Sequence, residues 1–104
     1  MKEWIYLKSK ISKLIRNSTR DFPIKSTAIK SKTGATKSEL ITIVRDLRRS
    51  GNPIASNTHG YFWARFASEL ETTLHSFEGR LAKTKQQLDA ILVSYNHMKT
   101  KEKR

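Results

Sequence analysis

The sequence predicts a mostly helical α+β fold that ends in a two-stranded hairpin and a long C-terminal helix. Three observations predict it. Apolar residues recur at helical spacing in three segments of the first fifty residues. Two short β-prone runs then flank a polar turn, and a heptad pattern of apolar residues follows them. From the length of 104 residues we expect one small domain, 1–66, and a helical extension, 67–104.

The composition is strongly basic. Lysine and arginine number 21 against nine acidic residues, a net charge of +12, and such an excess attracts polyanions. Residues 1–50 carry +9 of this charge and residues 51–104 carry +3. The absence of cysteine excludes a disulfide framework, and no stretch resembles a signal peptide or a transmembrane helix. We therefore expect a soluble, cytoplasmic protein with a polyanionic partner and no membrane association.

Residues 3–17 form the first expected helix. One side of it carries the apolar residues Trp4, Ile5, Leu7, Ile11, Leu14 and Ile15, and the other side carries cations. A basic amphipathic helix can bind an anionic membrane. An apolar stripe that precedes more of a domain is more often core, and we expect this helix to pack inward. An extended piece, 21–25, follows, because Pro23 disfavours helix in the residue before it.

A short helix, a glycine turn and a longer helix come next. We expect Ser26 to cap the short helix and Gly34 to close it. Thr36 caps the longer helix, Glu39 completes a capping box, and Gly51 ends the helix. Spacings of three and four predict one buried face made of Leu40, Ile43, Val44 and Leu47. This order and spacing are typical of a helix-turn-helix.

The exposed face of the longer helix is the predicted DNA contact. In a helix-turn-helix the second helix enters the major groove, where its side chains reach base edges and flanking cations hold phosphates. The candidate residues are Lys37, Ser38, Thr42, Arg45 and Arg49, together with Lys30 and Lys32 of the short helix. We favour DNA contact over a merely solvated basic face, because the charge is concentrated on this motif. Arg48 has the alternative of bracing the hairpin that follows.

Residues 52–64 predict that hairpin. Two β-prone runs surround a polar turn that ends in Gly60, and a hairpin placed directly after a helix-turn-helix is a wing. The turn residues are Asn57, Thr58 and His59. One interpretation is that they contact the minor groove or the backbone of DNA, and the other is that they form only a polar turn. Because strand side chains alternate between two faces, we expect at least two of Tyr61, Phe62 and Trp63 to pack in the core rather than stack on bases.

A long helix is expected from Ser68, with Glu71 completing a second capping box, to about Lys99. Its apolar residues follow steps of four and three, interrupted only by Thr84, and this heptad seam either folds back on the core or pairs with a second chain. We favour a homodimer, because a seam of this length requires a partner surface. The dimerisation residues are Leu74, Phe77, Leu81, Leu88, Ile91 and Tyr95. Residues 99–104 are expected to form a frayed basic tail.

Four elements occur in a recognisable order. They are Ile29 with Thr33-Gly34, the run from Ser38 to Leu47 that continues as Arg48-Arg49-Ser50-Gly51, then Pro53-Ile54-Ala55-Ser56, then Gly60-Tyr61-Phe62-Trp63-Ala64. Over residues 22–80 the chain resembles winged helix-turn-helix domains of small phage and prophage proteins, and is similar to the N-terminal domain of biotin-operon-repressor-like regulators. The resemblance implies double-stranded DNA binding in replication initiation or transcription regulation of a phage or mobile element.

Nothing in the sequence indicates catalysis. The three histidines have no metal-ligand spacing, the glycines form no phosphate-binding loop, and no motif frames a nucleophile. We therefore expect no enzymatic activity, no metal and no cofactor. The alternative function is that of a small phage interaction protein, which binds and inhibits a host replication or transcription factor through the winged-helix surface. RNA binding is a weaker third alternative, and a host or phage replication protein is a further candidate partner.

Overall fold

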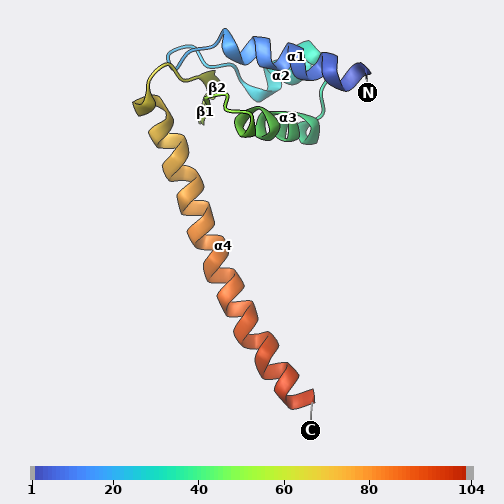
Figure 1. Cartoon of the computed structure of the whole chain (residues 1–104), viewed down its shortest axis with the longest axis vertical. Coiled ribbons are helices and arrows are strands. Elements are labelled where there is room, and N and C mark those ends of the chain that lie inside the picture. The colour runs from blue at the N-terminus through green and yellow to red at the C-terminus, as the bar shows by residue number, and fades with distance from the viewer. Residues whose placement is uncertain (1, 103–104) are drawn as a thin grey trace. The chain divides into compact units, whose positions relative to one another are not determined.

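A computed structural model describes residues 2–102 of the chain. The chain is divided into two compact units, of which the first ends at Thr73 and the second begins at Leu74. The elements, labelled in Figure 1, are α1 (Lys2–Arg16), α2 (Ser26–Thr33), α3 (Lys37–Arg49), β1 (Ile54–Asn57), β2 (Gly60–Trp63) and α4 (Ala67–Glu102). The predicted α+β class, with a hairpin and a long C-terminal helix, is confirmed. No helix within residues 2–102 has the length and apolarity that crossing a bilayer requires.

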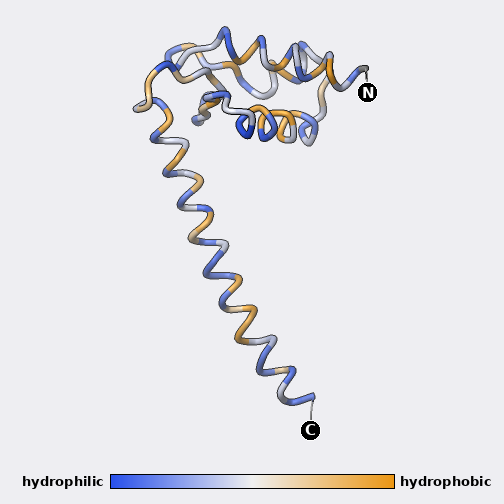
Figure 2. The backbone as a smooth tube through the Cα atoms, in the orientation of Figure 1, coloured by the Kyte–Doolittle hydropathy of each residue, from blue (hydrophilic) through white to orange (hydrophobic). Residues whose placement is uncertain are grey.

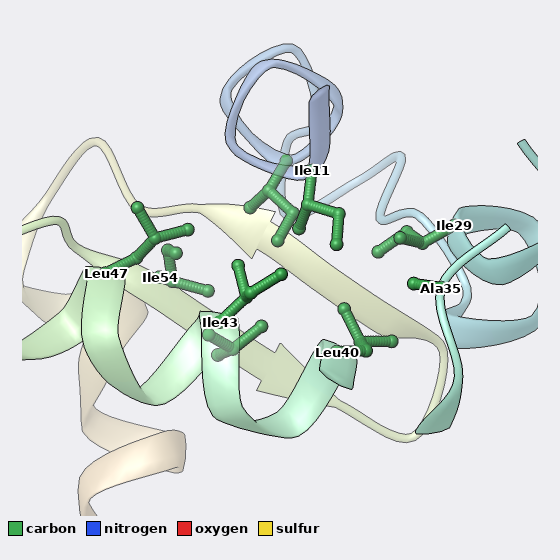
Figure 3. Packing of buried hydrophobic residues seen from close by; sticks show 9 residues of the cluster. Ile11, Ile29, Ala35, Leu40, Ile43, Leu47 and Ile54 are labelled. Carbon is green, nitrogen blue, oxygen red and sulfur yellow. The ribbon is translucent and has the colours of Figure 1, made fainter. Parts of the chain in front are cut away.

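The core of the first unit lies where three helices meet the first strand. Figure 3 shows side chains of α1, α2, α3 and β1 pointing toward one another. The buried residues of this three-helix cluster are Ile11, Ile15, Ile29, Ala35, Leu40, Ile43, Val44, Leu47 and Ile54. The predicted buried face of α3 is thus confirmed. Ile5 was wrongly placed on the buried face of α1. It is 73% exposed, because consecutive helical residues lie about 100° apart and Ile5 turns away from Trp4 and Ile15.

The hairpin is antiparallel, and a third short extended segment pairs with it. Ile54 lies opposite Trp63, and Ala55 lies opposite Phe62. On the other edge of β2, the Ile24 N–H donates to the Tyr61 carbonyl oxygen and the Tyr61 N–H donates to the Ile24 carbonyl oxygen, both at 2.8 Å. This pairing holds the segment around Pro23 extended, as its sequence predicts.

Gly60 is required where Ile24 approaches the hairpin. Its φ is 140°, and a Cβ at this position would overlap the carbonyl group of Ile24. Only glycine adopts this backbone conformation readily and leaves room for the pairing with Ile24.

The second face of the hairpin packs on the first turns of α4. Ala55, Phe62 and Ala64 are buried there against Leu70. Tyr61 and Trp63, on the other face, are half-buried against the three-helix cluster. The expectation that at least two of the three aromatic residues pack inward is therefore confirmed.

A buried threonine of α4 closes the outer edge of β1. The Ser56 N–H donates to Thr73 Oγ1 at 3.0 Å, and Thr73 Oγ1 donates to the Ser56 carbonyl oxygen at 3.1 Å. Thr73 is only 7% exposed. Both backbone groups of Ser56 are thus satisfied by one side chain, on an edge that would otherwise present unpaired groups.

The sequence predicted an N-terminal cap for α2, α3 and α4, and one of these three predictions is confirmed. At α3, the Thr36 N–H donates to Glu39 Oε1 at 2.8 Å and the Glu39 N–H donates to Thr36 Oγ1 at 3.1 Å, so the capping box is confirmed. At α2, the prediction of a Ser26 cap was wrong. Lys25 is the N-cap residue and makes no side-chain cap bond, because the pairing of Ile24 keeps the chain extended up to Lys25.

The start of α4 was also predicted wrongly. The helix begins at Ala67, so Ser68 lies within its first turn. The carboxylate that reaches back is that of Glu69, whose Oε1 accepts the Arg65 N–H at 2.8 Å, rather than that of Glu71. At its other end the helix continues through Glu102, beyond the expected end at Lys99. The tail is therefore helical to Glu102, and residues 103–104 lie outside the described residues.

Candidate nucleic-acid interface

The turn between α2 and α3 is fixed by local hydrogen bonds. Gly34 has a φ of 78°, and its N–H donates to the Lys30 carbonyl oxygen at 2.8 Å. Thr33 Oγ1 donates to the Ile29 carbonyl oxygen at 2.7 Å and accepts the Ala35 N–H at 3.2 Å. Ala35 itself is buried in the three-helix cluster. The turn therefore holds α3 at a defined angle to α2.

One face of α3 gathers the five predicted contact residues. Ser38, Arg45 and Arg49 are separated by seven and four residues, so they follow one line along the helix, opposite its buried side. Lys37 and Thr42 flank this line, and Thr42 is half-buried whereas the other four are exposed. Within residues 2–102, Lys37, Arg45 and Arg49 form no ion pair with a carboxylate. Their charges therefore remain available to an external anion.

Ile41 lies on the same face and was not among the predicted contact residues. It is 49% exposed, and it stands four residues after Lys37 and four before Arg45. Its place in the sequence contained the signal, since consecutive helical residues lie about 100° apart and Ile41 follows Leu40 on the side away from Ile43 and Leu47. An exposed aliphatic side chain on this face can make an apolar contact with the methyl group of thymine.

Arg48 braces the hairpin. Its Nε donates to the Ile54 carbonyl oxygen at 2.9 Å, and its Nη2 donates to Ser56 Oγ at 3.4 Å. At the same end of α3, Asn52 Nδ2 donates to the Leu47 carbonyl oxygen at 2.8 Å. These bonds confirm the bracing alternative for Arg48 and fix β1 relative to the end of α3.

The hairpin turn and the start of α2 form a depression of about 410 Å³. Its lining includes the exposed Asn57, Thr58 and His59 of the turn and, from the start of α2, Lys25, Ser26 and Thr27. Asn57 is partly engaged, because its Oδ1 accepts the His59 N–H at 2.7 Å and the Gly60 N–H at 3.2 Å. The first turn of α2 has no acidic residue and no side-chain cap. Its first backbone N–H groups can therefore serve an external acceptor.

The three residues that line this depression at the start of α2, the N-cap residue Lys25 with Ser26 and Thr27, were missed, because the hairpin turn lies far away in sequence. The available signal was that Lys25, Ser26 and Thr27 lie at the start of a helix whose first turn contains no acidic residue. The two α2 lysines that were predicted lie elsewhere. Lys30 and Lys32 occur in the last turn, and Lys32 lines a different groove, of about 390 Å³, with Tyr6, Lys10 and Lys13 of α1.

The unit that begins at Leu74 exposes the predicted seam. Every predicted dimerisation residue is exposed in the single chain: Leu74, Phe77, Leu81, Leu88, Ile91 and Tyr95. Figure 2 shows hydrophobic residues recurring between hydrophilic ones along α4. Leu92 is exposed as well and widens the apolar strip beside Ile91, whereas Val93 is exposed on the opposite side of the helix.

One hydrogen bond and one ion pair accompany the seam. His75 Nδ1 lies 3.1 Å from Glu78 Oε1, and Lys85 Nζ lies 3.3 Å from Asp89 Oδ1. All four side chains are more than half exposed, so these contacts contribute little stability and leave Glu78 and Lys85 accessible. In the part of the chain from 2 to 102, no three acidic or histidine side chains are grouped closely enough to hold a metal ion.

The sequence matches no family model, no curated protein and no solved structure. The chemistry of the α3 face, the hairpin turn and the seam is therefore the basis on which a function can be assigned.

Proposed function

We propose that this protein is a winged helix-turn-helix protein that binds double-stranded DNA through α3. The observation that carries the proposal is the face formed by Lys37, Ser38, Thr42, Arg45 and Arg49, with Ile41 among them. It combines three cations that form no ion pair within residues 2–102 with side chains suited to base edges, on a helix whose other side is anchored in the core. The supporting topology is a short helix, a fixed glycine turn, a second helix and a hairpin, in that order.

The roles of the α3 residues follow from their chemistry. Arg45 is suited to bidentate contact with guanine, and Ser38 and Thr42 can bond to several base edges. Ile41 would meet a thymine methyl group. Lys37 and Arg49, near the two ends of the helix, would hold phosphates and so fix the register on the duplex.

The hairpin turn would lie on the DNA backbone beside α3. Thr58 and His59 are exposed at its tip, and the depression behind them is bordered by Lys25 and by open N–H groups of α2. Phosphate oxygens are suitable acceptors for such groups. Lys30 and Lys32 would add long-range attraction to the same polyanion.

We further propose that the protein acts as a homodimer, paired through the exposed seam of α4. Burial of the large apolar side chains of the seam would remove an exposed strip that is unfavourable in water. Two copies of α3 would then contact two sites on DNA. In the host cytoplasm, the protein would act by occupying its DNA site. It would serve either replication initiation or transcription regulation of a phage or mobile element.

The test is fluorescence anisotropy with a random-sequence duplex across a series of salt concentrations. Binding that weakens steeply with salt is expected, because each phosphate contact releases counterions. R45A/R49A should lower the affinity and reduce the slope of log K against log salt by roughly one, because Arg49 is the residue of the two that would hold a phosphate. K83A/K101A is the matched control, since it removes the same charge from α4.

Two results would refute DNA binding through α3. One is the absence of binding at low salt, despite the net charge of +12. The other is an equal loss in K83A/K101A and R45A/R49A, which would show general charge attraction without a defined face. A protein that inhibits a host factor through the same surface would not need duplex binding at all.

A further inference from the structure

The seam of α4 carries charges along both of its edges. With Leu74 taken as heptad position a, the a positions are Leu74, Leu81, Leu88 and Tyr95, and the d positions are Phe77, Thr84, Ile91 and Met98. Beside them, the e positions are Glu78, Lys85, Leu92 and Lys99, and the g positions are Arg80, Gln87, Ser94 and Lys101. Residues at e and g meet the second helix of a coiled coil, and their charges select its orientation.

A parallel pair of these helices would bring like charges together. In a parallel coil each g residue faces the e residue five positions later in the second copy. Arg80 would therefore face Lys85 of the second copy, and this would occur twice in the dimer. The apolar residues do not favour the parallel dimer either, because that arrangement prefers β-branched residues at a, where this chain has leucine at three of four positions.

An antiparallel pair offers one alignment that joins opposite charges without also setting like charges against each other. In antiparallel coils, e faces e and g faces g. When Leu74 lies opposite Ile91 of the second copy, Glu78 faces Lys85 of the second copy, twice. In the same alignment Arg80 faces the neutral Gln87.

The neighbouring antiparallel alignments are unfavourable. A shift of one heptad in one direction sets Lys85 against Lys85 of the second copy. The opposite shift sets Glu78 against Glu78. The charges on the e and g positions thus select both an orientation and a register.

We infer that two copies of α4 pair antiparallel over residues 74–91, with Glu78 of each copy against Lys85 of the other. The inference rests on the proposed self-association and adds its geometry. Glu78 and Lys85 are 62% and 70% exposed in the single chain, so both side chains are accessible to a second copy.

The geometry has a consequence for DNA binding. Leu74 of the two copies lies at opposite ends of the paired segment, separated by seventeen residues, or roughly 25 Å along the axis at about 1.5 Å per residue. The two DNA-contacting units are then joined to opposite ends of the coil. A parallel pair would join both to the same end.

A charge reversal distinguishes the two orientations by the sign of its effect. In the antiparallel pair, K85E places a second carboxylate against Glu78, and the dimer Kd measured by sedimentation equilibrium should rise roughly two- to thirty-fold, the range that two exposed ion pairs span. In a parallel pair, the new carboxylate would face Arg80 and the Kd would fall. E78K/K85E restores opposite charges and should return the Kd toward the wild-type value. It is also the matched control, because it keeps the new repulsion between position 85 and Asp89.

Disulfide cross-linking tests the register, since the natural chain contains no cysteine. L74C and I91C are each expected to stay unlinked alone and to form a covalent dimer when mixed and oxidised. Efficient self-linking of either variant alone would overturn the antiparallel orientation. Dimers by sedimentation that fail to link in the mixture would overturn the register. A monomer at every concentration would instead show that the self-association itself is wrong, whatever the DNA measurements give.

Discussion

The substitution T73V tests how the hairpin is attached to α4. Valine has nearly the shape of threonine, so it leaves no cavity, but it cannot bond to Ser56. The N–H and carbonyl group of Ser56 would both lose their partner. An unsatisfied buried polar group costs about 1–3 kcal/mol, and water can reach part of the half-buried Ser56. We therefore expect T73V to lower the free energy of unfolding by about 2–4 kcal/mol.

Urea unfolding followed by tryptophan fluorescence is the suitable assay. Trp4 and Trp63 are both half-buried against the three-helix cluster, so they report on the unit that contains Thr73. All variants are compared at one protein concentration, because self-association would change the apparent stability.

The control is T73S, which keeps the hydroxyl and loses only a methyl group, at a cost of about 1 kcal/mol. If T73V is as stable as the wild type, or if T73S is destabilised as much as T73V, the hydroxyl does not hold the hairpin and the reasoning fails.

Two further predictions concern Gly60 and Ile41. G60A should lower the urea midpoint more than G51A, because both strain the backbone by about 1–3 kcal/mol but only an added Cβ at Gly60 overlaps Ile24; equal midpoints would contradict the close approach. Replacing thymine by uracil in a DNA site selected from random sequence should weaken wild-type binding about four-fold, the effect of one buried methyl group at about 0.8 kcal/mol. I41A should bind both DNAs equally, and a variant that still prefers thymine would show that another residue reads it.

Short sequence patterns correctly predicted those features that depend only on residues close together in the sequence. The capping box at Thr36 and Glu39 and the polar turn between β1 and β2 involve residues only a few positions apart, and the structure confirms both. The seam of α4 could also be predicted from the sequence, because a heptad repeat is a property of one helix. Exposure of its residues agrees with the sequence pattern, whereas the identity of the partner stays a prediction.

The features that sequence analysis missed depend on contacts between distant segments. The wrong Ser26 cap follows from the pairing of Ile24 with Tyr61, which no local pattern indicates. The role of Thr73 likewise depends on a strand seventeen residues earlier. A threonine on the polar side of a predicted helix gives no sign that it is buried, and only the packing of α4 on the hairpin makes it so.

Ser56 joins the two parts of the proposed function. Its side chain accepts a hydrogen bond from Arg48 at the end of α3, and its backbone bonds to Thr73 near the start of α4. The hairpin is thus held from both sides at one residue. A DNA backbone pressing on the hairpin turn would load both attachments, because β1 cannot move away from α3 without breaking the Arg48 bonds or move away from α4 without breaking the Thr73 bonds. In the proposed complex, the position of the turn on DNA would therefore be coupled to α3, which would read the sequence, and to the helix through which two copies would pair.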